Sequence, residues 1–150
     1  TGINRLNNFS EADGITKELE PNYGGIQKLY ALDTNLLTFA EDKVFKVLAD
    51  KDALFNADEG VNVTATRLVL GQAMAYQGNY GISTHPESFV YFRNNVYFSD
   101  AKRGSIVQLT PVNGQMFAIS SKGMSNFFRD RLRTADNIIG AYDGHKKKYV

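Results

Sequence analysis

The sequence contains no cysteine, only two histidines and only three prolines among its 150 residues. The absence of cysteine excludes a disulfide scaffold, a thiolate zinc site, an iron–sulfur cluster and a cysteine nucleophile. No apolar run approaches the roughly 18 residues that a membrane-spanning helix needs, and residues 1–5 lack the basic-then-apolar pattern of a signal peptide. We therefore expect neither a membrane span nor export by such a signal.

The composition that remains is that of a folded chain. Apolar residues make up 43%, charged residues 22% and aromatic residues 12%. Such a profile excludes intrinsic disorder as the main state, and the length is that of one domain. Because the sequence begins at Thr1 and a strand-like run has only just begun at Tyr149, we expect a fragment of a larger chain.

The formal net charge of +1 hides a strong asymmetry. Residues 1–60 carry 6 basic and 11 acidic side chains, which gives −5, whereas residues 122–150 carry 7 and 3, which gives +4. Complementary charges of this kind favour head-to-tail association or docking of an acidic partner. A solvated surface whose charges merely segregate is the alternative.

The first half of the chain predicts an irregular arm followed by strands. Residues 1–25 are polar and rich in turn residues, so we expect the β domain to occupy residues 26–150. Strand-like runs occur at 26–30, 36–40 and 44–48, and the last two are close enough for a tight hairpin. Residues 50–60 are acidic and loop-like, and 61–77 fits a short helix or a buried strand.

Four regularly spaced strand-like runs dominate the second half, at 88–92, 96–99, 105–109 and 115–119. Strong turn signals separate them, of which Asn113-Gly114 is the best hairpin signal because both residue types tolerate positive φ. Four hairpin-linked strands make an antiparallel meander. Further on, we expect Ser125 to cap a helix over 126–133, and a strand pattern resumes at 137–142 and 147–150 around a turn at 143–145.

Period-2 alternation in this meander predicts two apolar faces. One predicted set contains Val96, Phe98, Ile106 and Gln108. The other contains Tyr97, Ser99, Val107 and Leu109. Because both sets include apolar side chains, we expect the sheet to be covered on both sides.

A weak internal repeat supports a blade-like architecture. Asp42, Asp100 and Asp143 each lie in a turn that also carries a basic residue and that joins two strand-like runs. Their spacing is uneven but falls in the range of propeller blades. We therefore predict a mainly β fold, an antiparallel meander that resembles a propeller blade, with one or two short helices.

Residues with catalytic or metal-binding chemistry do not form a recognisable constellation. His85 and His145 are isolated, and the acidic residues of 50–59 lack the glycine of a calcium loop. Glu87 and Asp100 have no positional reason to pair across a cleft. Ser83, Ser88, His85 and Asp100 could form a nominal triad, but no nucleophile elbow presents a serine, and no phosphate-binding glycine motif occurs. We predict no enzymatic activity, no cofactor and no metal.

The basic residues near the C-terminal end are the candidate assembly surface. They are Arg129, Arg131, Arg133, Lys146, Lys147 and Lys148. With tyrosines nearby they could also bind a nucleic acid, but acidic residues interleave with them and the whole chain is neutral. We therefore expect protein partners and no direct nucleic-acid binding.

Several segments carry a resemblance to a known family. They are residues 35–43, 78–89, 96–104 and 119–128, in matching order across about 26–150. The sequence resembles a segment of the large virion structural proteins of tailed bacteriophages, including the tail muzzle, nozzle and stabilisation proteins of crAss-like and related phages. The resemblance implies a part of a propeller-like β domain within a longer chain.

The resemblance also implies a function in the virion. We expect a non-enzymatic tail component that acts through protein–protein assembly, with other tail proteins as partners and a homo-oligomeric ring as its form. The alternative is a host-surface carbohydrate-binding module of a phage tail or a bacterial propeller protein, with Tyr23, Tyr76, Tyr80 or Tyr91 as aromatic platforms. A depolymerase would need the carboxylate pair that the sequence does not offer.

Overall fold

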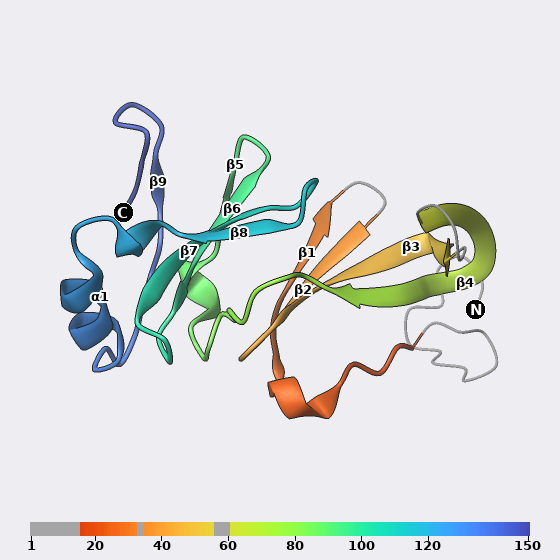
Figure 1. Ribbon diagram of the computed structural model, residues 1–150, viewed down its shortest axis with the longest axis horizontal. Helices are drawn as coiled ribbons and strands as arrows, with labels where there is room; N and C mark the ends of the chain where they lie inside the picture. The colour runs from red at the N-terminus through yellow and green to blue at the C-terminus, as the bar shows by residue number, and fades with distance from the viewer. Residues whose placement is uncertain (1–15, 33–34, 56–60) are drawn as a thin grey trace, which may run out of the picture.

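The computed structural model describes residues 16–32, 35–55 and 61–150, and the side chains of 50–55 and 61–69 are not among the described atoms. Within these ranges the protein is mainly β, with antiparallel sheets, as the sequence predicted. Two four-stranded sheets follow each other along the chain, and one α-helix and a two-stranded hairpin come after them (Figure 1). The described sheets do not close into a ring, so the propeller blade stays a prediction.

The first sheet has strand order β1-β2-β3-β4. Its strands are β1 (Ile26–Leu32), β2 (Asn35–Ala40), β3 (Val44–Phe55) and β4 (Val61–Ala75). The three predicted strands and the tight hairpin between β2 and β3 are confirmed. The loop predicted over 50–60 was wrong for 50–55, which belong to β3, and residues 51–55 pair with 61–65 of β4 in an antiparallel ladder. The same ladder makes 61–75 a strand, and residues 56–60 lie outside the described part.

The second sheet is the predicted meander, with strand order β5-β6-β7-β8. Its strands are β5 (Val90–Phe92), β6 (Asn95–Asp100), β7 (Ser105–Thr110) and β8 (Gln115–Ala118). Arg93 and Asn94 form the first turn with φ of 46° and 62°. Positive φ at both central residues is the backbone of the turn that best matches the twist of a two-residue hairpin.

The alternation of side chains within β6 and within β7 is confirmed. The prediction of which residues of the two strands share a face was wrong. Val96 lies opposite Leu109 and Phe98 opposite Val107, whereas Tyr97 lies opposite Gln108. The turn that pairs Asp100 with Ser105 sets this register. One face therefore carries Val96, Phe98, Val107 and Leu109, all fully buried, and the other carries Tyr97, Ser99, Ile106 and Gln108.

The buried face of the second sheet packs against the first sheet. Phe98 meets Phe39 edge-on with ring centroids 5.4 Å apart, and Tyr91 lies 5.1 Å from Tyr30. The hydrophobic core is therefore shared by the two sheets. It consists of Leu37, Phe39, Val44, Tyr76, Ile82, Val96, Phe98, Val107 and Leu109.

The opposite face of the second sheet is partly covered by the C-terminal hairpin, formed by β9 (Tyr142–Asp143) and β10 (Lys148–Tyr149). Phe92 stacks on Tyr142 with ring centroids 4.1 Å apart. Because Tyr91 and Phe92 are adjacent in β5, they point to opposite faces, one toward the first sheet and the other toward the hairpin. The second sheet thus lies between two layers, as Figure 1 shows, and the prediction of cover on both sides is confirmed there.

The described helices are short. The α-helix α1 spans Ser125–Leu132, and single 3-10 turns lie at Pro21–Tyr23, Pro86–Ser88 and Ile119–Ser121. The predicted cap was wrong: Ser125 is the first residue inside α1, Met124 precedes it, and no side chain caps the helix. Of the helices in the described part of the chain, none is long and apolar enough to cross a membrane.

The described part of the predicted arm, residues 16–25, contains no strand and lies against the first sheet. The ring of Tyr23 packs on Phe45 with centroids 5.7 Å apart. The amide of Asp42 donates to the carbonyl of Tyr23, and the amide of Glu41 donates to that of Gly25. Residues 1–15 of the arm lie outside the described part.

The shared core predicts that two phenylalanines of the second sheet contribute very differently to the free energy of unfolding. Phe98 is fully buried between the sheets, whereas Phe117 is 53% exposed on β8. Phe98→Ala should lower the free energy of unfolding by about 3–5 kcal/mol, and Phe117→Ala by less than about 1 kcal/mol. Urea unfolding of both variants measures this. Equal, small losses would contradict the packing of the two sheets.

Candidate functional site

The predicted basic surface lies on α1 and the C-terminal hairpin, which occupy the same end of the molecule (Figure 1). Arg129 and Arg131 lie within α1, and Arg133 is the residue that ends it. Lys146 and Lys147 belong to the turn of the hairpin, and Lys148 begins β10. All six of these basic residues are exposed.

Some of these basic side chains already have partners. Arg129 forms an ion pair with Asp130 at 3.0 Å, and the guanidinium of Arg131 lies 5.9 Å from the centroid of the Phe127 ring. The Arg129 ion pair is exposed and therefore contributes little stability. None of the residues of α1 is buried, so the helix presents accessible aromatic and cationic side chains.

A groove of about 360 Å³ connects the hairpin to the helix. Lys147 and Lys148 line it from the hairpin, Phe128 lines it from α1, and Tyr97 and Ile106 line it from the second sheet. The structure therefore brings two of the three predicted lysines close to α1. The arginines lie on the helix itself, outside the set of residues that line the groove.

Tyrosines hold the hairpin against the second sheet. The hydroxyl of Tyr149 donates to the carbonyl of Ser88 at 2.6 Å, and burial raises the pKa of Tyr149 to about 12. Burial, together with Tyr142, also raises the pKa of Tyr97. These phenols therefore stay neutral over the physiological range and serve as packing and hydrogen-bonding groups.

Among the described residues Asp100 is the most highly connected polar side chain, and it is 0% exposed; the sequence marked it as a turn residue but did not reveal this structural role. Its Oδ1 accepts from the Ser83 hydroxyl at 3.2 Å and from the Arg103 amide at 3.0 Å. Its Oδ2 accepts from the Gly81 amide at 3.2 Å and from Arg103 Nη1 at 2.9 Å. A buried carboxylate needs such partners, because an unpaired buried charge is strongly destabilising.

Gly81 is required at this place by close approach. A Cβ atom there would overlap the backbone of Glu41 and Asp42. The amides that follow continue the contact, since Ile82 donates to Ala40 and Ser83 donates to Glu41. The segment that joins the two sheets is therefore fixed both to the β2–β3 turn and to Asp100. Because Asp100 lies where β6 ends, this segment holds the β2–β3 turn close to the β6–β7 turn.

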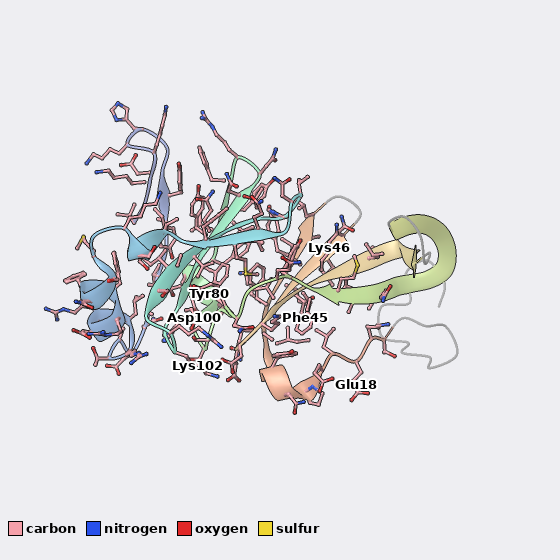
Figure 2. The ribbon with its side chains drawn as sticks, viewed as in Figure 1. Glu18, Phe45, Lys46, Tyr80, Asp100 and Lys102 are labelled. Carbon is pink, nitrogen blue, oxygen red and sulfur yellow. The ribbon has the colours of Figure 1, made fainter. Side chains whose placement is uncertain are left out.

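Ion pairs complete the junction between the β2–β3 turn and the β6–β7 turn. Figure 2 labels Asp100 and Lys102 of the second turn, which lie near each other. Lys102 Nζ lies 3.0 Å from Glu41 and 2.8 Å from Asp42, and Arg103 Nη1 lies 3.2 Å from Asp42. The hydrogen bonds from Lys102 hold the pKa values of Glu41 and Asp42 below their ordinary values. The first sheet contributes acidic groups and the second sheet contributes basic groups, so the contact is complementary.

The nominal triad is only partly assembled. Ser83 does contact Asp100, but Ser88 Oγ donates to the carbonyl of His85 at 2.8 Å, and the Asp100 carboxylate is already bound by Arg103. Glu87 is exposed in the 3-10 turn Pro86–Ser88. Among the described residues, no three His, Cys, Asp or Glu side chains are grouped so as to hold a metal ion.

The four tyrosines of the carbohydrate alternative are engaged in packing. Tyr76 is buried, its hydroxyl donates to the carbonyl of Pro111, and burial raises its pKa to about 12. Tyr80 and Tyr91 are partly buried against the core, and Tyr23 packs on Phe45. Aromatic rings used in this way offer little surface for a sugar.

The buried hydrogen bonds of Asp100 predict that its removal strongly lowers the free energy of unfolding. Asp100→Ala leaves the Gly81 amide, the Ser83 hydroxyl and the Arg103 amide without their acceptor and removes one of the two carboxylates bound by Arg103, so it should lower the free energy of unfolding by about 3–5 kcal/mol. Asp143→Ala is the matched control, because Asp143 accepts two turn amides but is only half-buried, and we expect a loss of about 1 kcal/mol. Chemical unfolding would contradict this role of Asp100 if the two losses were equal.

The junction also predicts acid sensitivity. Because the folded pKa values of Glu41 and Asp42 lie below the unfolded values of about 4, their stabilisation is present above pH 4 and is lost as the pH falls through the folded values. Lys102→Met should therefore flatten the loss of stability below about pH 5. Thermal melts over this range test it, with Lys122→Met, at an exposed lysine after β8, as the control that keeps the parental slope.

Comparison of the chain with protein-family models, with curated proteins and with solved structures finds no match in any of the three.

Proposed function

We propose that the chain is a non-enzymatic structural component of a bacteriophage tail and acts through protein–protein assembly. The observation that carries the proposal is the layered stacking of its β units. The first sheet packs on one face of the second, and the C-terminal hairpin packs on the other face. Neighbouring blades of a propeller also pack face to face. We therefore propose that each sheet is one blade of a larger propeller-like domain.

The distribution of charge supports an assembly role. The acidic surplus of the sequence lies in residues 1–60, and α1 and the hairpin, which carry the basic residues, lie at the opposite end of the molecule from the first sheet (Figure 1). Contacts between unlike ends are heterologous and close into rings when the rotation fits. A homo-oligomeric ring in the virion is the form that this arrangement suits.

The internal junction shows how such a contact works. Glu41 and Asp42 of the first sheet meet Lys102 and Arg103 of the second. A contact between two copies would again pair acidic with basic side chains, with Lys146 and Lys148 on the basic side and acidic residues other than Glu41 and Asp42, which are paired within the chain, on the other. The contact would weaken with salt, because exposed charges are screened over about 8–10 Å at ordinary ionic strength.

Charge reversal in the hairpin tests the proposal. Lys146→Glu with Lys148→Glu should reduce oligomer size or incorporation into tail particles at low salt and leave folding intact. The matched control is Lys17→Glu with Arg93→Glu, which makes the same change in charge at exposed residues outside the basic surface. Sedimentation velocity and particle assembly read the result. Equal assembly of both variants and the parent at low salt would overturn the charge-based contact.

A further inference from the structure

A hollow of about 560 Å³ lies between the segment that follows β4 and the turn that joins β7 to β8. Gln77 and Gly78 line it from the first wall, and Asn113, Gln115 and Phe117 line it from the second. Its volume falls in the range of small-ligand sites. It shares no lining residue with the groove between the hairpin and α1, so it is separate from the basic surface.

The two walls of this hollow are held together by Tyr76. Its hydroxyl donates to the carbonyl of Pro111, in the β7–β8 turn, at 3.1 Å, and its amide donates to the carbonyl of Val44 at 3.0 Å. Within the turn, the Gly114 amide donates to the carbonyl of Thr110 at 2.9 Å. Both walls are therefore fixed by hydrogen bonds of the chain itself, and a ligand does not have to order them on binding.

The polar side chains of the hollow are carboxamides. Gln77, Asn113 and Gln115 are all exposed, and each offers an NH₂ group that donates and an oxygen that accepts. No residue in the described lining carries a charge. A phosphate or a carboxylate would find no cation there, whereas a ligand rich in hydroxyl groups could both donate to and accept from the same side chains.

Phe117 adds an aromatic surface beside these carboxamides. Its side chain is 53% exposed, unlike the rings of Tyr23, Tyr76, Tyr80 and Tyr91, which are engaged in packing. The face of an aromatic ring is electronegative and attracts polarised C–H groups. A sugar ring presents C–H groups on its face and hydroxyl groups at its rim. An exposed phenyl ring next to carboxamides therefore complements both parts of a sugar.

We propose that this hollow binds a neutral saccharide, with one sugar ring stacked on Phe117 and its hydroxyl groups hydrogen-bonded to Gln77, Asn113 and Gln115. The inference goes beyond the proposed assembly function and does not depend on it. It concerns binding without hydrolysis, because the described lining offers no carboxylate or histidine to serve as acid or base.

A tryptophan in place of Phe117 reports on the stacked ring. The chain contains no tryptophan, so Phe117→Trp places a single fluorophore in the hollow. The probes are cellobiose, maltose, lactose and N,N′-diacetylchitobiose, each titrated to about 50 mM. At least one should change the emission with a Kd of about 1–10 mM. No response to any probe would overturn the inference.

The matched control for the fluorophore is Val112→Trp. Val112 belongs to the same turn and is 78% exposed, but it lies outside the lining of the hollow. Its tryptophan should not respond to the saccharide that changes the emission at position 117. An equal response of the two variants would show a general effect of the sugar on exposed tryptophan and would overturn the site.

Substitutions in the lining separate stacking from simple apolar contact. Phe117→Leu keeps an apolar side chain and removes the ring, so it should weaken binding of the responding saccharide about tenfold in an NMR titration. Gln115→Ala should weaken binding about fivefold, and Val112→Ala should leave it unchanged. All three positions are exposed, so folding should stay intact, which urea unfolding checks. Parental affinity of Phe117→Leu would overturn the stacking.

Salt separates this site from the charge-based assembly contact. Because the described lining is uncharged, the saccharide affinity should change less than about twofold between about 50 and 500 mM salt, whereas contacts between exposed charges weaken. The Lys146→Glu, Lys148→Glu chain should bind the saccharide as the parent does. If assembly fails its test, this binding is still expected, and if no saccharide binds, the assembly proposal still stands.

A strong salt dependence of saccharide binding, or its loss in the hairpin variant, would place the sugar on the basic surface instead and overturn the inference.

Discussion

The buried carboxylate of Asp100 is the constraint on which the arrangement of the two sheets depends. A charge with no access to water must be paired and hydrogen-bonded, and here its partners come from two places in the chain. Gly81 and Ser83 belong to the segment that joins the sheets, and Arg103 belongs to the turn of the second sheet. Arg103 also reaches Asp42 in the turn of the first sheet. A change in the relative position of the sheets would leave at least one of these groups unpaired, so the carboxylate makes that position specific in a way that aromatic packing alone does not.

The three aspartate turns show how loop length decides what an acidic residue does. In the turns of Asp100 and Asp143, four residues separate the cross-strand pair, and the carboxylate folds back to accept its own turn amide. In the first sheet the last cross-strand pair, Phe39 with Val44, is also five residues apart, but the Ala40 amide donates to the Lys43 carbonyl, so only Glu41 and Asp42 lie beyond the last hydrogen bond. The shorter loop brings Asp42 to Lys102 and Arg103 of the next sheet. The same residue type thus closes a turn in two units and joins two sheets in the third.

Much of the fold could be predicted from local patterns, whereas the junction could not. Alternation and turn residues located the strands from Ile26 to Leu48 and the meander of the second sheet, because both signals are local. The extension of β3 to Phe55 was missed, because it depends on pairing with β4 and the acidic residues there resemble a loop. The partners of Asp100 lie 17 and 19 residues earlier in the chain, in a segment that reads only as a turn. The repeated acidic turn was the available signal, but spacing alone does not distinguish a buried aspartate from an exposed one.

The basic surface of α1 and the hairpin differs from the junction between the sheets in how many of its charged side chains have a partner of opposite charge. Lys102 and Arg103 have carboxylate partners from the neighbouring sheet, whereas Lys147 and Lys148 line a groove without a carboxylate in its described lining. In the turn of the hairpin, His145 and Lys146 occupy the positions of Lys102 and Arg103, two and three residues after the aspartate. A complementary acidic neighbour fixes Arg103, and Lys146 is the exposed basic residue at the equivalent place of the C-terminal hairpin.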